Sequence, residues 1–537
     1  MPVAIRPTRT VSRPLSGLGA LLGVKLPADR EVPSVAPGSV IFNGPGLDAA
    51  VCGVTHDSRM VRPGDLYAAL PGTQVHGAEF SAAAAAAGAV AILTDPAGRD
   101  RAAAAGLPVY VVADPRARLG DVACWIYGDP SRKLRLIGVT GTSGKTTTSY
   151  LAEAGLRRAG HVTGLIGGVE TRIGAEVQPS ELTTPEATDL QALLATMAER
   201  GVTAAAMEVS SHALALGRVA GTHYDVAVFT NLSQDHLDFH ADLEDYFAAK
   251  AELFTPRYAG AGVVNLDDAH GRRLAASAPI PVTTFSATGN PAADWRAENV
   301  RVGADGSAFR VIGPGGVAAD ASVALIGPFN VANALGAIVA LVEAGMGLDD
   351  AVAGVGSCPG VPGRLERVDA GGAAPDLTVL VDYSHKPGAV EAVLGALRPV
   401  TQGNLIIVLG CGGDRDRAKR PLMGAAAATL ADVAIFTSDN PRSEDPLAIL
   451  AAMLDGAIGV PPLRRARVIV EPDRTAAIDL AVSSAAKGDV ILVAGKGHER
   501  GQYVAGRVLP FDDRAVTAEA LRQRAGAYRA AHPKGEL

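Results

Sequence analysis

The stretch GVTGTSGKTTTSY, residues 138–150, is the part of the chain that best indicates its fold. It approaches the common phosphate-loop pattern G-x-x-x-x-G-K-[ST] without matching it. Counting back from Gly144, Lys145 and Thr146, the pattern requires a glycine at position 139, where the chain has Val139. Glycines stand at 138 and 141 instead, so the interpretation depends on the surrounding sequence.

The flanking residues supply the context that a phosphate loop requires. LRLIGV (134–139) is a plausible buried strand, TGTSGK (140–145) a tight polar turn, and residues 146–160 have helical spacing. In such a unit, backbone N–H groups at the helix N-terminus face the anion, a lysine neutralises it and a hydroxyl ligates magnesium. Lys145 and Thr146 fit the last two roles. A glycine-rich turn can arise by chance, but this context favours phosphate binding.

Length and composition limit the class of protein. A chain of 537 residues predicts about three domains. The net charge of −7 argues against a nucleic-acid or membrane-surface protein. No apolar run reaches the ~18 residues of a membrane span. The four cysteines are far apart and indicate reduced thiols without a zinc site: Cys52, Cys124, Cys358 and Cys411.

The N-terminus resembles a signal peptide only faintly. Arg6, Arg9 and Arg13 precede the short, glycine-rich apolar stretch LSGLGALLGV (15–24), and no clear cleavage site follows. We expect the first ~25 residues to form a flexible basic tail.

Short apolar runs alternate with Ala/Leu-rich helical stretches, which is typical of α/β proteins. The Pro/Gly-rich segments GDPSRK (128–133) and CPGVPGR (358–364) divide the chain into three blocks. We predict a smaller α/β N-terminal domain (1–133), a central phosphate-loop ATPase-type domain with a parallel or mixed sheet (134–365), and a Rossmann-like C-terminal domain (366–537).

Polar residues follow the apolar strands of the central block, where a parallel sheet places its ligands. TAAAMEVSSH ends in Glu208, Ser210 and His212, and the next strand leads to Asn231, Asp235, His236 and Asp238. A glutamate at a strand end near a phosphate loop suits a magnesium ligand or a water-positioning group. Glu208 could also be a solvated strand end, and His236 could equally be a structural loop histidine.

The third block repeats this design without a phosphate loop. Four of its strands have polar, mostly charged ends, which together predict a ligand-binding rim. Any one of these ends alone would be read as a solvated turn. The residues at these ends are Asp382, Lys386, Arg415, Asp439, Asn440, Arg442, Gly495, Lys496, His498 and Glu499.

An ordered set of motifs covers nearly the whole chain. It comprises HDSRMVRPGDLYAALPG (56–72), TGTSGKT (140–146), ELTTPE (181–186), MEVSSHALALGR (207–218), DHLDFH (235–240), YFAAKAELF (246–254), GPFNVANALGA (327–337), PGRLE (362–366), DYSHKP (382–387) and GCGGDRDRAKRP (410–421). With these motifs the chain resembles the Mur ligases, the ATP-dependent amino-acid-adding enzymes of peptidoglycan synthesis. That family commonly uses this variant glycine pattern, which accounts for Val139. Within the family, SDNPRSEDP (438–446) and GKGHE (495–499) point to the addition of meso-diaminopimelate to UDP-N-acetylmuramoyl-L-alanyl-D-glutamate.

The resemblance implies site residues for ATP and its metal ions. Those expected to bind the nucleotide are Thr140, Gly141, Thr142, Ser143, Gly144, Lys145, Thr146, Thr147, Asn330, Asn333, Arg364 and Asp382. Lys386 has no clear role, since many relatives carry threonine there. Lys250 matches a lysine that the family carboxylates with carbon dioxide. Two magnesium ions are implied, with Thr146, Glu208, His236 and the Lys250 carbamate as ligands. Lys145, Lys250, Glu208 and His236 form the implied catalytic set.

The resemblance also implies residues for the other two substrates. The UDP-linked substrate would be held by Asp57, Ser58, His76, Gly77, Ala78, Thr183, Thr184, Ser210 and Arg218. Diaminopimelate would be held by Arg415, Asp439, Asn440, Pro441, Arg442, Gly495 and Glu499. The expected activity is that of an ADP-forming acid–amino-acid ligase working through an acyl phosphate. The expected setting is a cytoplasmic monomer with small-molecule substrates and neither nucleic-acid nor membrane partners.

Three alternatives remain open at this point. An L-lysine-adding Mur ligase would differ only in the amino-acid pocket. A folylpolyglutamate synthetase-like ligase shares the ATP chemistry, but the N-terminal UDP-type block argues against it. A nucleotide-switch binding protein without ligase chemistry would not need two charged rims and the TTPE segment.

Overall fold

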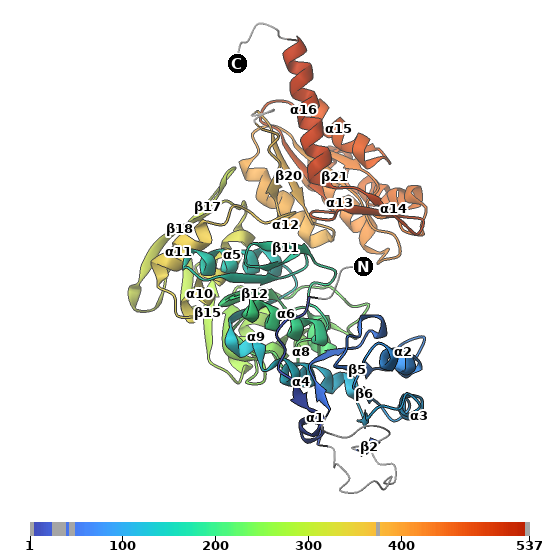
Figure 1. Ribbon diagram of the computed structural model, residues 1–537. Coiled ribbons are helices and arrows are strands. Elements are labelled where there is room, and N and C mark those ends of the chain that lie inside the picture. Colours follow the sequence, from blue (N-terminus) through green and yellow to red (C-terminus); the bar gives the residue numbers. More distant parts are fainter. Residues whose placement is uncertain (1–4, 24–38, 42–48, 372–375, 532–537) are drawn as a thin grey trace. The chain divides into compact units, whose positions relative to one another are not determined.

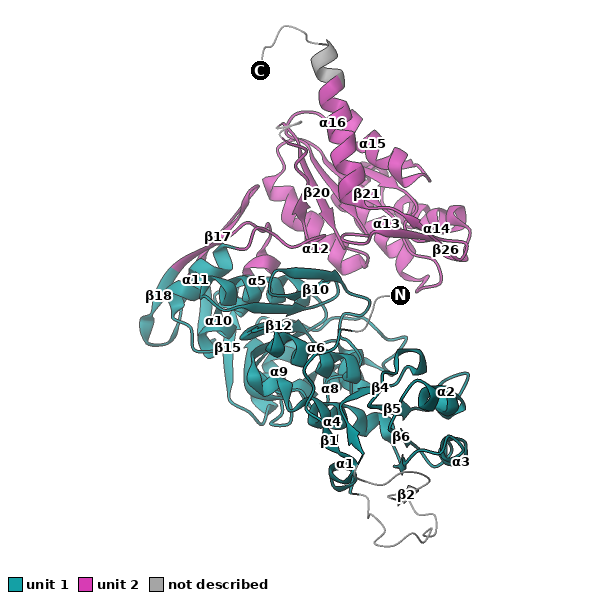
Figure 2. Ribbon diagram, in the orientation of Figure 1, with its two compact units in different colours: residues 1–298, 311–319, 332–357 teal, residues 299–310, 320–331, 358–537 magenta. Residues whose placement is uncertain are grey.

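The computed structural model describes residues 5–23, 39–41, 49–371 and 376–531. Its contacts divide the chain into two compact units (Figure 2). The first comprises residues 1–298, 311–319 and 332–357, and the second residues 299–310, 320–331 and 358–537. Within the described ranges, no helix combines the length and the apolarity needed to cross a membrane.

The first unit begins with a small α/β layer. Its five-stranded sheet has the order β2 (Ser39–Ile41), β7 (Val109–Val111), β6 (Ala91–Thr94), β5 (Asp65–Ala69) and β4 (Gly53–Thr55). Strands β4 to β7 are parallel, and β2 is antiparallel to β7. Helices α2 (Ser81–Ala86), α3 (Arg99–Ala103) and α4 (Pro115–Tyr127) connect or follow these strands. Helix α4 begins where Asp114 accepts a hydrogen bond from the Ala117 N–H.

The expectation of a flexible N-terminal tail is wrong for residues 5–23. Strand β1 (Arg13–Pro14) pairs with β3 (Ala50–Val51), and helix α1 (Leu15–Leu22) follows. The helix buries Leu15, Leu18 and Leu22 in the core of this layer, a spacing of one apolar helix face. The Arg6 guanidinium contacts the Asp65 carboxylate at 2.6 Å, and both side chains are nearly buried. Arg6 is therefore one partner of a buried ion pair, and the apolar stretch that begins at Leu15 forms a helix in the core.

The central sheet is built around the glycine-rich stretch. In the order β9 (Thr163–Ile166), β12 (Ala204–Glu208), β8 (Arg135–Thr140), β13 (Tyr224–Phe229), β14 (Ala259–Asn265) and β15 (Val282–Ser286), neighbouring strands are parallel. Parallel strands covered on both faces read as continuous apolar runs, as β8 and β12 do. Their carboxyl ends meet at one edge, with β8 between β12 and β13. This arrangement brings Thr140, Glu208 and the residues after Phe229 together.

Further strands and helices complete this part of the fold (Figure 1). Strands β10 (Glu170–Ile173) and β11 (Glu176–Pro179) extend the sheet beyond β9, and β16 (Trp295–Gly303), β17 (Gly306–Ile312) and β18 (Ala318–Val323) extend it beyond β15. The helices are α5 (Lys145–Arg158), α6 (Ala187–Glu199), α7 (Ser211–Ala215), α8 (Leu243–Ala251), α9 (Ala269–Ser277), α10 (Pro328–Glu343) and α11 (Leu348–Gly356).

The second unit contains a doubly covered sheet. Its order is β19 (Glu366–Arg367), β20 (Thr378–Asp382), β24 (Val490–Ala494), β21 (Leu405–Leu409), β22 (Val433–Phe436) and β23 (Arg467–Val470). All but β19 run parallel. Helices α12 (Pro387–Leu397), α13 (Lys419–Leu430) and α14 (Pro446–Ile458) cover one face, and α15 (Arg474–Ser484) and α16 (Asp513–Ala531) cover the other. A hairpin of β25 (Gly501–Val504) and β26 (Arg507–Pro510) follows β24. The predicted α/β fold class is confirmed.

A buried ion pair joins the two helices on the second face. The Arg474 guanidinium donates to both Asp513 carboxylate oxygens at 2.7 Å, and both side chains have no exposed surface. Arg474 also donates to the Ala494 carbonyl at 3.0 Å, where β24 ends. The ion pair therefore links the first residues of α15 and α16 to the carboxyl end of β24.

We predict that Arg474→Met lowers the free energy of unfolding by about 3–5 kcal/mol, because it leaves a buried carboxylate without its partner. Urea unfolding followed by circular dichroism measures the change. The matched control is Arg367→Met, which breaks the exposed Arg367–Asp305 pair and should change stability little. Equal effects of the two substitutions would contradict the prediction.

Candidate active site

The turn between β8 and α5 has the backbone of a phosphate loop. Gly141 and Gly144 have φ of 146° and 88°, values that only glycine adopts readily. A Cβ at Gly141 would lie 1.9 Å from the Thr230 hydroxyl oxygen. Val139 is fully buried in β8, and a Cβ at Gly138 would meet the Tyr224 ring at 2.6 Å. The unusual glycine spacing thus reflects a strand that packs closely on Tyr224 before the loop begins.

Two lysines approach the same oxygen of this loop. Lys145 donates to the carbonyl oxygens of Gly141 at 2.8 Å and Thr142 at 3.0 Å. Lys250, on α8, donates to the Gly141 oxygen at 2.9 Å and is almost completely buried. Both ammonium groups thus fall within the ~6 Å range in which like charges disfavour each other. The loop carries concentrated positive charge suited to an anion.

Thr146 and Glu208 form an oxygen-rich pair beside the loop. The Thr146 hydroxyl donates to one Glu208 carboxylate oxygen at 3.0 Å, and the Gly168 N–H donates to the other at 2.9 Å. Both side chains are buried. A hydroxyl and a carboxylate are ligands that Mg²⁺ prefers, so the two residues fit a magnesium ion. Thr140 and Thr147 are buried at the end of β8 and in the first turn of α5.

His236 lies in the loop after β13, and its ring is near those of His212 and Tyr246. Its Nε2 is 3.1 Å from an Asp235 carboxylate oxygen, and its backbone has φ of 55°. The His236 ring is 5.9 Å from the Tyr246 ring, and the Lys250 ammonium lies over that same ring at 4.6 Å. His236 and Lys250 thus flank Tyr246. In the described part of the chain, no three His, Cys, Asp or Glu side chains are grouped to hold a metal ion. Of the four expected magnesium ligands, only Glu208 and His236 are of these residue types, so this result does not bear on the expected set.

The remaining residues expected to bind the nucleotide fall in both units. Asn333 belongs to the first unit, where its Oδ1 would be 2.3 Å from a Cβ at Gly144. Asn330, Arg364 and Asp382 belong to the second. Asn330 donates to the Ile326 carbonyl at 2.9 Å, and the Arg364 guanidinium lies 4.6 Å from the Tyr383 ring centre. Burial raises the pKa of the Asp382 carboxyl, although hydrogen bonds from Ser384 and Leu365 oppose the rise.

The residues expected at the UDP end lie after β4 and β5. Asp57 accepts hydrogen bonds from the Arg59 backbone at 3.0 Å and its guanidinium at 2.7 Å, and Ser58 begins the short 3-10 helix Ser58–Met60. His76 contacts Asp95 at 3.0 Å and accepts from the Ala78 N–H. A Cβ at Gly77 would lie 2.9 Å from the Leu70 backbone. These loops meet at the carboxyl edge of parallel strands, where ligands bind.

Thr184, Ser210 and Arg218 come together beside Glu208. The Thr184 hydroxyl donates to the Glu208 carbonyl at 2.9 Å and accepts from the Ser210 N–H at 3.1 Å. Arg218 donates to the Thr184 carbonyl at 3.4 Å and pairs with Glu186 at 2.9 Å. A Cβ at Gly168 would lie 3.0 Å from the Thr183 hydroxyl oxygen.

The second unit contains a charged cluster at the ends of β22 and β24. Asp439, Asn440 and Glu499 meet around Lys496, whose side chain has no exposed surface. Lys496 donates to Asn440 at 2.9 Å and to Glu499 at 3.0 Å, and its ammonium is 3.6 Å from Asp439. A Cβ at Gly495 would lie 3.0 Å from an Asp439 oxygen.

Arg442 stands next to this cluster in a constrained turn after Pro441. It has φ of 52°, its N–H donates to the Tyr503 carbonyl at 2.8 Å, and its carbonyl accepts from Ala505 at 2.7 Å. Its guanidinium donates to the Gly413 carbonyl at 2.6 Å. Arg415 is exposed on the neighbouring loop.

Two residues in these sites received no specific role from the sequence. Asn231 accepts from the N–H groups of Thr142 and Ser143 at 2.9 and 3.0 Å, and so holds the phosphate loop. Lys496 is the centre of the charged cluster. The sequence marks both only as polar strand ends, and the signal that points to them is their position two residues after a buried parallel strand.

A glycine loop between a buried strand and a helix, with an acidic strand end beside it, defines an α/β protein that binds nucleotide phosphates. Three sequence models match the chain in order: the Mur ligase family catalytic domain at residues 50–127, the middle domain at 139–341 and the glutamate ligase domain at 363–497. The chain belongs to the Mur ligase family.

Individual relatives support the same assignment. The UDP-N-acetylmuramoyl-L-alanyl-D-glutamate–2,6-diaminopimelate ligase of Streptomyces avermitilis is 63% identical over 90% of this chain and 94% of its own length. The UDP-N-acetylmuramyl-tripeptide synthetase of Leifsonia xyli is 47% identical over 97% and 98%. A solved structure of a UDP-N-acetylmuramoyl-L-alanyl-D-glutamate–2,6-diaminopimelate ligase is 32% identical, with a TM-score of 0.65 over 96% of this chain and 99% of that one.

Proposed function

We propose that the chain is an ATP-dependent ligase that adds meso-diaminopimelate to UDP-N-acetylmuramoyl-L-alanyl-D-glutamate during peptidoglycan precursor synthesis. The observation that carries this choice of amino acid is the Asp439–Lys496–Glu499 cluster with Arg442 beside it. It provides carboxylates for ammonium groups and a guanidinium for a carboxylate. The name of the Streptomyces avermitilis relative supports it.

The reaction needs an activated carboxylate. The substrate carboxylate oxygen attacks the γ-phosphorus of ATP, a carbon–oxygen–phosphorus linkage forms, and the bond to the ADP oxygen breaks. The diaminopimelate amine then attacks the acyl carbon, phosphate leaves and the amine loses a proton. Lys145 and the backbone N–H groups at the start of α5 would neutralise phosphate charge in both steps.

Thr146 and Glu208 would hold a magnesium ion, which lowers the repulsion between the triphosphate and the incoming carboxylate. Asn333 would lie beside the nucleotide at the loop. Asn330, Arg364 and Asp382 would contribute further nucleotide contacts from the second unit.

A second magnesium ion would be held by His236 and by Lys250 in carboxylated form. As an ammonium group, Lys250 would repel a metal ion, and it adds a second positive charge beside Lys145. Once deprotonated, the Lys250 amine would attack carbon dioxide and lose a further proton, so that a carbamate anion would replace the positive charge. This would remove the repulsion between the lysines and provide oxygen ligands.

The other substrates would bind through the groups described above. Asp57, Ser58 and the His76–Ala78 segment would contact the uridine diphosphate end, and Thr183, Thr184, Ser210 and Arg218 the muramoyl dipeptide. Asp439, Asn440 and Glu499 would hold ammonium groups of diaminopimelate, with Pro441 and Gly495 shaping the pocket. Arg442 and Arg415 would bind its carboxylates. We propose three domains at 1–133, 134–365 and 366–537 in a cytoplasmic monomer with small-molecule substrates.

The first test concerns the phosphate loop. Lys145→Ala should abolish ligation while the fold survives, because a transition-state charge contact is usually worth ~10²-fold or more in rate. Phosphate release with all three substrates measures the effect. Lys133→Ala removes an exposed lysine just before β8 and should retain activity. More than about a tenth of wild-type turnover in Lys145→Ala would refute the role.

The second test concerns Lys250. Native mass spectrometry should find one carbon dioxide on this residue. Lys250→Ala should lose most activity and recover part of it with small carboxylic acids, because they replace the anion. Depletion of carbon dioxide should slow the wild type and leave the variant unchanged. Full activity of Lys250→Ala without any additive would rule out a need for the carbamate.

The third test concerns amino-acid selection. Diaminopimelate differs from L-lysine by a far carboxylate, which a guanidinium grips through two parallel hydrogen bonds. We expect the wild type to prefer meso-diaminopimelate by roughly 10³-fold or more. Arg442→Lys should lose most of this activity with little change in the KM values of ATP and the UDP-dipeptide.

The control for this test is Arg464→Lys, an exposed arginine in the same unit, which should keep the preference. Equal use of both amino acids by the wild type would favour a lysine-adding or relaxed ligase. Phosphate release that needs the folate-type acceptor instead of the UDP-dipeptide would favour the folylpolyglutamate alternative.

A further inference from the structure

The phosphate loop is supported by a second loop, residues 230–233, which follows β13. Asn231 accepts hydrogen bonds from the Thr142 and Ser143 N–H groups of the phosphate loop. Its side-chain amide donates to the Ser143 carbonyl at 3.1 Å. The Thr230 hydroxyl donates to the same carbonyl at 2.6 Å. Ser233 and Thr142 exchange two hydrogen bonds, at 3.0 and 3.2 Å. The position of the phosphate loop therefore depends on where residues 230–233 are held.

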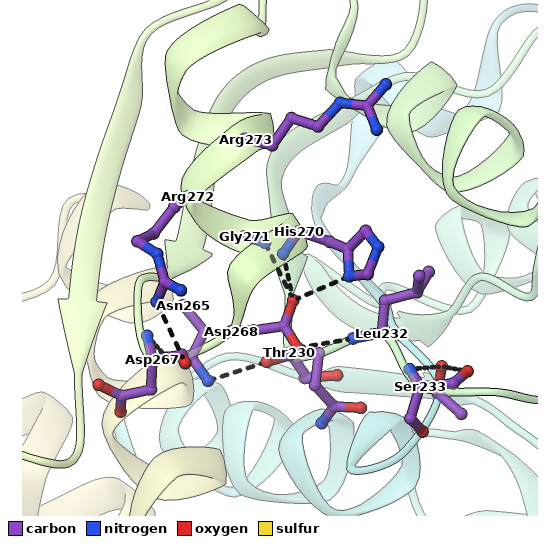
Figure 3. A network of polar contacts seen from close by, with 12 residues as sticks. Thr230, Leu232, Ser233, Asn265, Asp267, Asp268, His270, Gly271, Arg272 and Arg273 are labelled. Carbon is purple, nitrogen blue, oxygen red and sulfur yellow. Dashed lines mark hydrogen bonds and ion pairs between the residues drawn. The ribbon is translucent and has the colours of Figure 1, made fainter. Parts of the chain in front are cut away.

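This supporting loop is also held by Asn265, the last residue of β14, and by Asp268 in the turn that follows. Asp268 accepts a hydrogen bond from the Leu232 N–H at 3.1 Å through one carboxylate oxygen. Its other oxygen accepts from the N–H groups of His270 and Gly271, and so caps helix α9. The Asn265 amide donates to the Thr230 carbonyl at 2.9 Å. Figure 3 shows both side chains directed at this loop.

The neighbouring Asp267 has a different set of partners. Its carboxylate accepts from the hydroxyls of Ser286 and Thr288 at 2.6 Å, and from the Ala287 N–H at 2.7 Å. These partners lie at the end of β15 and in the turn after it, and none of them belongs to the supporting loop. Two adjacent aspartates thus make similar numbers of hydrogen bonds to two different segments.

We propose that Asp268 and Asn265 are positioning residues for nucleotide binding, acting through the 230–233 loop on the phosphate loop. Residues 230–233 follow the end of β13, where the Thr230 N–H still donates to the Thr140 carbonyl of β8 at 3.1 Å. The Asp268 carboxylate joins this loop to a packed helix, because it binds the Leu232 N–H and also caps α9. Close packing supports the joint, since a Cβ at Gly271 would lie 1.9 Å from the Asn265 carbonyl oxygen. The inference rests on the proposed ATP-dependent function.

Two isosteric substitutions test this connection. Asp268→Asn keeps an oxygen to cap α9, because Asn and Asp cap helices about equally well, but its amide nitrogen would face the Leu232 N–H. Asn265→Asp keeps the acceptor for the Asp267 N–H but sets a carboxylate oxygen against the Thr230 carbonyl. Each change should raise the KM for ATP, and the dissociation constant of a non-hydrolysable ATP analogue, about tenfold. The KM values of the UDP-dipeptide and diaminopimelate should stay within about twofold of wild type.

The matched control is Asp267→Asn, the same substitution one residue earlier. It should lower the melting temperature comparably and leave the affinity for the ATP analogue within about twofold of wild type. If Asp268 had a purely structural role, Asp268→Asn and Asp267→Asn would both lower the melting temperature, and neither would change the affinity for the ATP analogue. Should Asp268→Asn fail to fold, Asn265→Asp leaves the α9 cap intact and gives the same readout.

The inference is overturned if the variants that fold bind the analogue as tightly as wild type, or if Asp267→Asn weakens binding equally. Failure of the wild type itself to bind the analogue would overturn the proposed function, and the inference with it. Measuring wild type first separates these two failures.

Discussion

The central site depends on one backbone oxygen, that of Gly141, which accepts hydrogen bonds from both Lys145 and Lys250. Two ammonium groups this close to each other are unfavourable unless negative charge is nearby. The start of α5 adds the partial positive charge of a helix N-terminus. The loop therefore favours anions, and the proposed reaction supplies them as phosphates, a carboxylate and a lysine carbamate. Glu208, held by Thr146 and Gly168, contributes a negative charge of the protein itself beside the loop.

The sequence allowed the site's local parts to be predicted because they follow from short-range constraints. A glycine-rich turn between an apolar strand and a helix has few possible conformations, so Lys145 and Thr146 could be placed from residues 134–160 alone. Glu208 could be placed because the ends of parallel strands share one edge of a sheet. The order of the motifs identified the family, and with it the alternation of strands and helices in each sheet.

Long-range partners could not be predicted in this way. Arg6 was interpreted as part of a basic tail because its partner, Asp65, lies in a strand 59 residues later. Asp268 has no unusual sequence signature, since its importance arises only when α9 and the 230–233 loop pack against each other. Lys496 reads as one more charged strand end, although the fold buries it completely. In each case the missing information is which distant group the charged side chain meets.

The cluster around Lys496 shows how the second unit uses charge differently from the first. One buried ammonium group faces two carboxylates, Asp439 and Glu499, which leaves net negative charge for an incoming ammonium group. Arg442 adds a positive group alongside, and its left-handed backbone costs roughly 1–2 kcal/mol in a residue with a side chain. The hairpin of β25 and β26 offsets this strain, because it binds both the N–H and the carbonyl of Arg442. Gln502 and Tyr503 also bind Asp439 and Asn440, so a single hairpin fixes the separation between the negative and positive ends of the proposed pocket. That fixed separation, more than the presence of charge, is what would distinguish an amino acid with a carboxylate at its far end from one without it.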